Sequence, residues 1–163
     1  TCRLIDPIGL RFIEDPFGPN RSFQARRLQA SLATPLAIGE DLPDAQTIAA
    51  ALEDITILRL DATTCGGVTA AVAAAETADA KGVSVLPHVF LPIHAQLAGA
   101  LSQIEAVELI PEDTEACPMY DLLEGSPQIE DGLLTIDQTP GAGFRLNWRA
   151  VERHAEQSWS TAL

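Results

Sequence analysis

Short apolar runs that end in an ionisable residue recur along this chain at intervals of about one strand plus one helix. The runs end at Glu14, Glu40, Asp61, His88 and Glu108, so that successive positions differ by 26, 21, 27 and 20 residues. Strands that alternate with helices at this spacing indicate βαβ units and a parallel sheet. Strands in such a sheet are buried on both faces, which explains why the runs are continuously apolar rather than alternating.

The same pattern predicts the individual elements. We expect strands at 10–13, 36–38, 55–60, 83–86 and 106–110, and helices at 21–33, 44–52, 68–80 and 92–101. Asp44 is a suitable N-cap for the second helix, and Pro92 suits the first turn of the fourth. Further along the chain, Asp131-Gly132 predicts a hairpin that joins 127–130 to 133–136, and a closing helix is expected near 149–157.

Two parallel architectures fit these elements. One is an open, doubly wound sheet of five strands, although the chain lacks the glycine-rich phosphate-binding motif of a dinucleotide-binding fold after its first strand. The other is part of a (β/α)8 barrel, which typically needs about 250 residues. With 163 residues, this chain would form an incomplete barrel.

The charge and the cysteines limit the partners and the compartment. Ten basic residues against 23 acidic ones give a net charge of −13, which should repel nucleic acid and anionic membranes. No apolar stretch reaches the roughly 20 residues that a membrane span needs. Cys2, Cys65 and Cys117 are widely spaced and include no CxxC motif, which favours a reducing cytoplasm over a disulfide scaffold.

The residues that end the strands suggest a shared site. In parallel α/β barrels the carboxyl ends of the strands meet on one face, and that face holds the active site. Clustered carboxylates repel one another unless a cation lies among them, and hard oxygen ligands favour Mg²⁺. An imidazole such as that of His88 can serve as acid or base, and Asp61 on the neighbouring strand could orient its ring. Any single acid could instead be a helix N-cap or a solvated loop residue, and His94 is expected to be a packing or surface residue.

Several segments resemble the C-terminal barrel domain of the mandelate racemase/muconate lactonizing enzyme family, in the enolase superfamily. They are FIEDP (12–16), TPLAIGED (34–41), LDATTCGG (60–67), LPHVF (86–90) and LTIDQTPGAG (134–143). The resemblance implies an α/β fold that is a partial (β/α)8 TIM barrel, with strands four to eight and their helices, followed by a C-terminal hairpin and tail. Residues 1–126 would form the barrel part, and residues 127–163 would pack on a capping domain outside this chain.

The resemblance also implies a role for each strand-end residue. Glu14 and Glu40 resemble two of the carboxylates that bind Mg²⁺. Asp61 and His88 resemble an Asp–His dyad in which the histidine is the general base or acid. Glu108 resembles the acid that hydrogen-bonds the substrate carboxylate.

The position of Asp61 indicates a subgroup. Members with two catalytic lysines have one of them on the sixth strand at this position, whereas the only lysine of this chain is Lys81. The chain therefore resembles the mandelate racemase subgroup, in which the commonest activity is the dehydration of a sugar acid. The alternatives are a racemase or epimerase of a 2-hydroxy acid, and a non-catalytic α/β domain that only binds or assembles.

The family's capping domain, first three barrel strands, a further aspartate ligand and a lysine-bearing second strand have no counterpart here. We therefore expect a fragment of a longer cytoplasmic enzyme that is inactive alone. Open sheet edges and exposed apolar faces favour self-association, which we expect at 10–13 and 106–110. The enzyme hypothesis requires Glu14 near Glu40, with His88 near Asp61 on the same face.

Overall fold

The computed structural model describes residues 1–111, 114, 117–125, 128–136 and 140–159. The chain divides into two compact units, Thr1–Leu109 and Ile110–Leu163, and each is described by itself. The boundary that the sequence predicts, between residues 126 and 127, lies at residues outside the described part of the chain.

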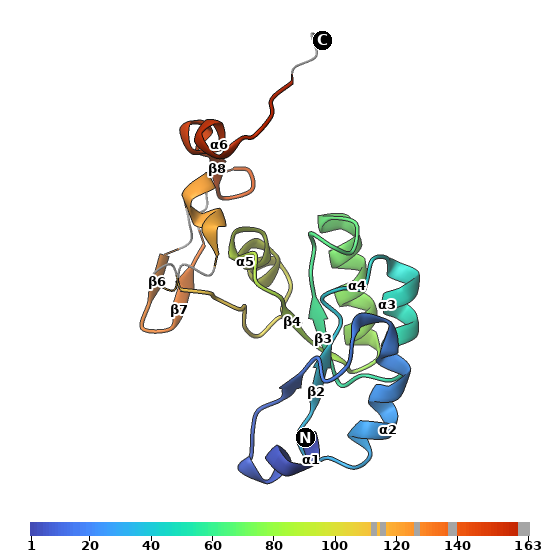
Figure 1. The fold of residues 1–163 in the computed structure, drawn as a ribbon. Coiled ribbons are helices and arrows are strands. Elements are labelled where there is room, and N and C mark those ends of the chain that lie inside the picture. Colours follow the sequence, from blue (N-terminus) through green and yellow to red (C-terminus); the bar gives the residue numbers. More distant parts are fainter. Residues whose placement is uncertain (112–113, 115–116, 126–127, 137–139, 160–163) are drawn as a thin grey trace. The chain divides into compact units, whose positions relative to one another are not determined.

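The first unit contains a four-stranded parallel sheet with the strand order β1-β2-β3-β4 (Figure 1). Its strands are β1 (Ile13–Glu14), β2 (Leu36–Ile38), β3 (Ile57–Leu60) and β4 (Ser84–Pro87). In register, Glu14 lies beside Ala37, Ala37 beside Ile57, and Arg59 beside Leu86. The prediction of a parallel α/β sheet is therefore confirmed.

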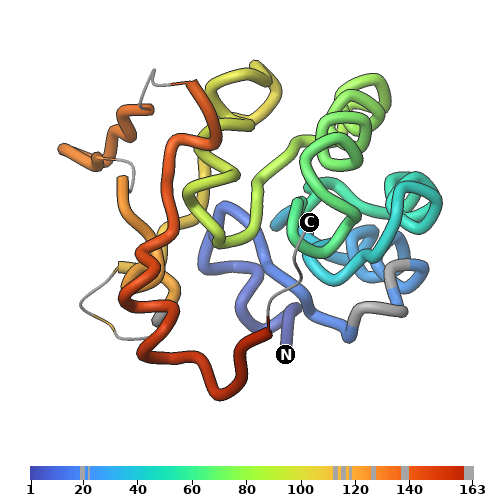
Figure 2. Tube along the Cα trace, turned by 90° about the horizontal axis from the view of Figure 1, so that it is seen from above, coloured from blue at the N-terminus to red at the C-terminus, as the bar shows by residue number. Residues whose placement is uncertain are grey.

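Helices alternate with these strands. They are α1 (Cys2–Ile5), η1 (Asp6–Ile8), η2 (Pro19–Gln24), α2 (Ala25–Gln29), α3 (Ala45–Ala51), α4 (Val68–Ala80) and α5 (Leu91–Ala100). The bounds of α4 are those expected, and the side chain of Asp44 caps α3 by accepting from the backbone N–H of Thr47 at 2.8 Å. α3 and α4 lie side by side (Figure 2). None of the described helices is long and apolar enough to cross a membrane.

Side-chain alternation gives the sheet two different faces. Leu58, Leu60 and Val85 point to the helix face, where they join the main apolar core with residues of α3 and α4. Ala37, Ile57 and Leu86 form a small cluster on the opposite side, which we call the inner face. Arg59 alternates with Leu58 and Leu60 and so lies on the inner face, where it is 3% exposed.

The predicted strand at 106–110 is wrong. Residues 105–110 form no strand, and only Ile104 makes a single parallel bridge, with Val85 of β4. Beyond that bridge the segment is held by side chains: Glu105 pairs with Arg11 at 3.3 Å, and Glu108 pairs with Arg59. The predicted helix at 21–33 is also shorter than expected, because its region divides into η2 and α2 and ends at Gln29.

The second unit contains two small antiparallel pairs. β5 (Leu123–Glu124) pairs with β8 (Arg145–Leu146), and β6 (Gln128–Glu130) pairs with β7 (Leu133–Thr135). Asp131 and Gly132 have positive φ angles of 50° and 75°, which suit a type I′ hairpin turn and confirm that prediction. The unit also has η4 (Pro118–Leu122) and α6 (Trp148–His154), which begins and ends earlier than the expected helix at 149–157.

Candidate active site

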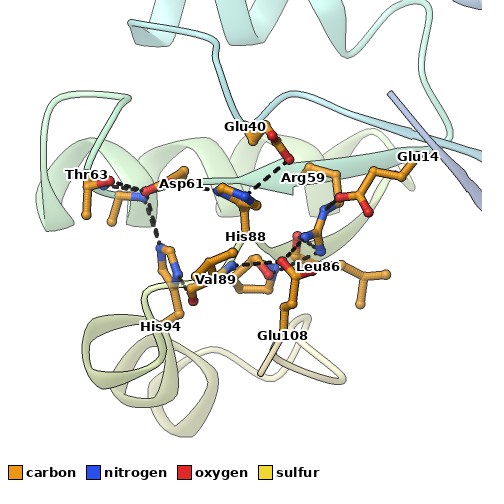
Figure 3. A network of polar contacts seen from close by, with 12 residues as sticks. Glu14, Glu40, Arg59, Asp61, Thr63, Leu86, His88, Val89, His94 and Glu108 are labelled. Atoms are coloured by element: carbon orange, nitrogen blue, oxygen red, sulfur yellow. Dashed lines mark hydrogen bonds and ion pairs between the residues drawn. The ribbon is translucent and has the colours of Figure 1, made fainter. Parts of the chain in front are cut away.

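The parallel strands bring the predicted residues to one edge of the sheet. Glu14 ends β1, Glu40 follows β2, Asp61 follows β3 directly, and His88 follows β4 directly. Figure 3 shows two ion-paired groups at this edge: Glu40 and Asp61 contact His88, whereas Glu14 and Glu108 contact Arg59. The five residues are therefore not scattered over the surface.

Asp61 orients the ring of His88. Its Oδ2 lies 3.0 Å from His88 Nδ1, and its Oδ1 accepts from both the backbone N–H and the hydroxyl of Thr63 at 2.7 Å. Burial raises the pKa of Asp61, but the hydrogen bonds from Thr63 and His88 outweigh it, so the pKa lies below its ordinary value. An ionised Asp61 keeps the proton of the imidazole on Nδ1 and leaves Nε2 for other partners.

Nε2 of His88 faces Glu40, with 3.5 Å to Glu40 Oε2. Burial raises the pKa of Glu40, the positive form of His88 lowers it, and the negative charge of Glu14 raises it further; the net shift is upward. Glu40 is reached through Gly39, whose φ of +136° and close neighbours leave no room for a side chain.

Arg59 is the residue that the sequence reasoning missed. Its Nη1 donates to the carbonyls of Leu86 and Pro87 at 3.3 and 3.2 Å, its Nη2 pairs with Glu108 Oε2, and its Nε pairs with Glu14 Oε1. The available signal was a lone charge inside the apolar run 55–60, two residues before Asp61 and therefore on the same face of the strand.

Two strand ends carry strained backbone. Asp15, directly after Glu14, has a φ of 35°, and Val89, directly after His88, has a φ of 41°. A positive φ is unusual for a residue other than glycine and is costly for a β-branched one. Such strain persists only where the surroundings determine the conformation, and it concentrates at functional sites.

His94 on α5 is buried and joins two of the loops. Its Nε2 accepts from the backbone N–H of Ala62 at 3.0 Å, and its Nδ1 therefore carries the proton and donates to the carbonyl of Val89 at 2.9 Å. Burial lowers the pKa of His94, so the ring is neutral. It is a packing residue, as one of the two expectations had it, and it holds the backbone beside Asp61 to the backbone beside His88.

The carboxylates at this edge suit a hard divalent cation. Burial is the largest cause that raises the pKa of Asp15, to about 6, and the neighbouring charges of Glu40, Glu14 and Asp41 add to it. Carboxylate oxygens are the ligands that a hard divalent cation prefers. Within the described residues, however, no group of three or more His, Cys, Asp or Glu side chains is arranged to hold an ion. Glu14 and Glu40 supply oxygen donors of the kind that Mg²⁺ prefers, but the described residues by themselves do not complete a metal site.

Comparison with known proteins identifies the family. Residues 1–150 match the enolase C-terminal domain-like family. This chain belongs to that family. The parallel sheet with its helices is accordingly a partial TIM barrel, and the resemblance seen in the sequence is confirmed.

The relatives are enzymes with several activities. An L-Lys-D/L-Arg epimerase of Methylococcus capsulatus is 29% identical over 149 residues, which are 87% of this chain and 42% of the relative. A D-galactonate dehydratase family member of Enterocloster bolteae is 27% identical over 170 residues, with 95% and 41% covered. The solved L-talarate dehydratase of Polaromonas sp. JS666, complexed with Mg and L-glucarate, is 25% identical with a TM-score of 0.79, and the match covers 93% of this chain and 41% of that one.

This enolase-family chain thus spans about two fifths of the length of the relatives it matches. The matched proteins include both an epimerase and an L-talarate dehydratase, so membership of the family does not by itself determine the reaction.

Proposed function

We propose that the protein to which this chain belongs is a Mg²⁺-dependent enzyme that removes the proton α to a carboxylate, and that its reaction is the dehydration of a sugar acid. The observation that carries this proposal is the imidazole of His88, held at 3.0 Å by Asp61 on the strand-end edge that also bears Glu14 and Glu40. A base that is oriented by a carboxylate and lies beside hard oxygen ligands suits proton transfer next to a carboxylate.

Each residue has a definite task in this proposal. Glu14 and Glu40 would hold Mg²⁺, together with ligands from outside this chain, and the bound ion would supply Lewis-acid stabilisation of the negative charge that develops on the substrate carboxylate. His88 moves a proton at Nε2, while Asp61 keeps Nδ1 protonated and stabilises the charged imidazolium. Glu108 would donate a hydrogen bond from Oε1–H to the substrate carboxylate, which leaves Oε2 to accept from Arg59 and Val89. In the dehydration, the C–H bond α to the carboxylate and the C–O bond at the β carbon break, water leaves, and the enol tautomerises to a 2-oxo acid.

The choice of substrate class rests on relatives. A galactonate dehydratase family member and an L-talarate dehydratase bound to L-glucarate are both similar to this chain. Racemisation or epimerisation is the second candidate, and the similarity to an epimerase favours it. Asp61 occupies the position of a lysine in the two-lysine type of enzyme that the resemblance describes, and this supports the His–Asp subgroup, in which the resemblance makes dehydration the commonest activity.

The setting proposed for the enzyme is the cytoplasm, without nucleic-acid or membrane partners. Cys2, Cys65 and Cys117 are free thiols, which supports a reducing compartment. The net charge of −13 supports the absence of polyanionic partners.

The test uses the longest natural protein that contains this chain, with Mg²⁺ and a library of aldonic and aldaric acids. His88→Asn should lower kcat by about 10²–10⁴-fold, while calorimetry shows Mg²⁺ binding retained, and removal of the metal with EDTA should abolish turnover. His154→Asn, which changes an exposed histidine of α6, is the matched control and should leave kcat unchanged. Normal turnover in His88→Asn would remove His88 from the mechanism, and the 163-residue chain alone should be inactive.

A further inference from the structure

Arg59 is a buried cation inside a strand, and its charge has to be compensated. It lies on β3 between Leu58 and Leu60, both of which are fully buried in the apolar core, and its own side chain is 4% exposed. A charged group in such a place is costly unless it is paired and hydrogen-bonded. The contacts of Arg59 therefore indicate what keeps it there.

The guanidinium is anchored on one side by backbone. Nη1 donates to two consecutive carbonyls of β4, those of Leu86 and Pro87. Because a guanidinium is a rigid planar fork, fixing one arm fixes the direction of the others. The remaining arms reach Glu108 through Nη2 and Glu14 through Nε.

The environment of Arg59 Nε provides a second, independent observation. This nitrogen is buried and forms an ion pair with the carboxylate of Glu14. Among the buried side-chain nitrogen and oxygen atoms of the described residues, it is the one without an aligned hydrogen-bond partner. The guanidinium of Arg59 thus lies between the two carboxylates and is paired with them instead of being solvated by water.

Glu108 depends on this arrangement more than the other site residues do. Residues 105–110 form no strand, so no ladder of backbone hydrogen bonds sets the place of Glu108. Its Oε2 instead accepts from Arg59 Nη2 and from the backbone N–H of Val89 at 3.0 Å (Figure 3). These two donors take the place of strand pairing.

We propose that Arg59 is a positioning residue that holds Glu108 and Glu14 at fixed places on either side of its guanidinium, and so sets the separation between the acid for the substrate carboxylate and an acid for the metal. The roles of the two acids rest on the proposed function, whereas the positioning itself does not. Arg59 acts through Glu108 and Glu14 and has no need to touch substrate.

The first test measures Glu108 without any activity. In the 163-residue chain, hydrogen exchange of the Val89 amide, followed by ¹H–¹⁵N NMR, reports whether Glu108 Oε2 is in place. Arg59→Met should speed that exchange about tenfold or more, because the carboxylate loses its side-chain anchor. Arg11→Met is the matched control: it removes an exposed arginine, with a side chain 70% exposed, that pairs with Glu105 in the same segment, and it should leave Val89 unchanged.

A second variant covers the case in which Arg59→Met does not fold. Arg59→Lys keeps the charge but has a single ammonium, which cannot serve two carbonyls and two carboxylates together. It should give faster exchange at Val89 than wild type. Wild-type exchange and an unmoved Val89 resonance in the folded variants would overturn the proposal.

The kinetic test separates this inference from the proposed function. In the longest natural protein, with the sugar acid that it turns over, Arg59→Met should lower kcat about 10²-fold with KM changed less than about threefold, and Arg59→Lys should restore part of kcat. If no sugar acid is turned over, the proposed function fails while the Val89 measurement still decides the role of Arg59. Unchanged kcat beside faster Val89 exchange would overturn the catalytic importance of the positioning.

Discussion

Gly39 is a single backbone position that determines where a proposed metal ligand lies. Its φ is +136°, and a Cβ there would come within 2.8 Å of Leu58 Cδ1 and 3.0 Å of the Arg59 carbonyl. Glycine adopts such angles freely, whereas other residues pay for them. A side chain at residue 39 would therefore strain the backbone directly before Glu40, whose Oε2 lies 3.5 Å from His88 Nε2.

Gly39→Ala should be more destabilising than Gly9→Ala. Gly9 also has a positive φ, of +78°, but nothing lies within 4 Å of a Cβ added there, so this control measures the backbone cost alone. That cost should be about 1–2 kcal/mol for the left-handed conformation of Gly9, and at Gly39 the more extreme φ together with the steric clash should add about 1–3 kcal/mol. Urea denaturation of the 163-residue chain gives both values; equal losses of unfolding free energy would show that the space around Gly39 adjusts without cost.

The buried His94 makes stability depend on pH. Burial holds its pKa in the folded chain below the ordinary value of 6.5, so at pH below about 6.5 the unfolded chain binds a proton that the folded chain does not. The free energy of unfolding that His94 contributes is therefore fully present above pH 6.5 and is lost as the pH falls toward the folded pKa.

His94→Gln tests this dependence. The neutral amide should lower the free energy of unfolding by about 1–3 kcal/mol at pH 8, because its hydrogen bonds to Ala62 and Val89 are weaker. The difference in unfolding free energy between the variant and wild type should become smaller as the pH falls from 7.5 to 5.5. Denaturation curves at each pH measure the gap. His154→Gln, at an exposed position, should run parallel to wild type; a gap for His94→Gln that stays constant with pH would contradict the neutral buried ring.

Sequence reasoning found the residues that follow apolar runs and missed those that act from within them. Glu40, Asp61 and His88 stand where a strand ends, so spacing alone predicts a common edge. Arg59 lies inside a run that otherwise indicates core, and its importance depends on Glu108, 49 residues away. His94 carries no signal of its own, because only the fold brings α5 against the loops after β3 and β4.

At the scale of elements, helices and turns were predicted best where residues within the element itself determine its ends. The bounds of α4 follow from an alanine-rich segment between Gly67 and Gly82, and the hairpin follows from Asp131-Gly132 at the turn. The strand expected at 106–110 does not form, because an apolar run alone does not ensure backbone pairing with a neighbouring strand. The chain pairs with β4 only at Ile104, and the segment after it is held by side-chain contacts such as Glu108 with Arg59. The order of elements was predictable from the chain, but strand pairing at the edge of the sheet was not.

At the scale of the whole molecule, the open edges of the sheet favour self-association, whereas the net charge disfavours it. Within residues 1–109, β1 pairs only with β2, and large apolar side chains such as Leu10, 39% exposed, and Leu109, 40% exposed, lie at the surface. Unpaired edges and exposed apolar groups favour association between copies. The net charge of −13 on each copy opposes it, and salt screens this repulsion.

We therefore predict that the 163-residue chain self-associates through 10–13 and 106–110, and more tightly as NaCl rises from 50 to 500 mM. The double substitution Leu10→Lys and Leu109→Lys should raise the dissociation constant about tenfold or more, because burying a lysine in the interface is unfavourable. The double substitution Leu133→Lys and Leu146→Lys is the control, since it places the same two charges on side chains of the second unit that are 75% and 45% exposed. Sedimentation velocity measures the change: a monomer at every salt concentration would contradict association, and an equal effect of the control substitutions would move the interface away from the sheet edges.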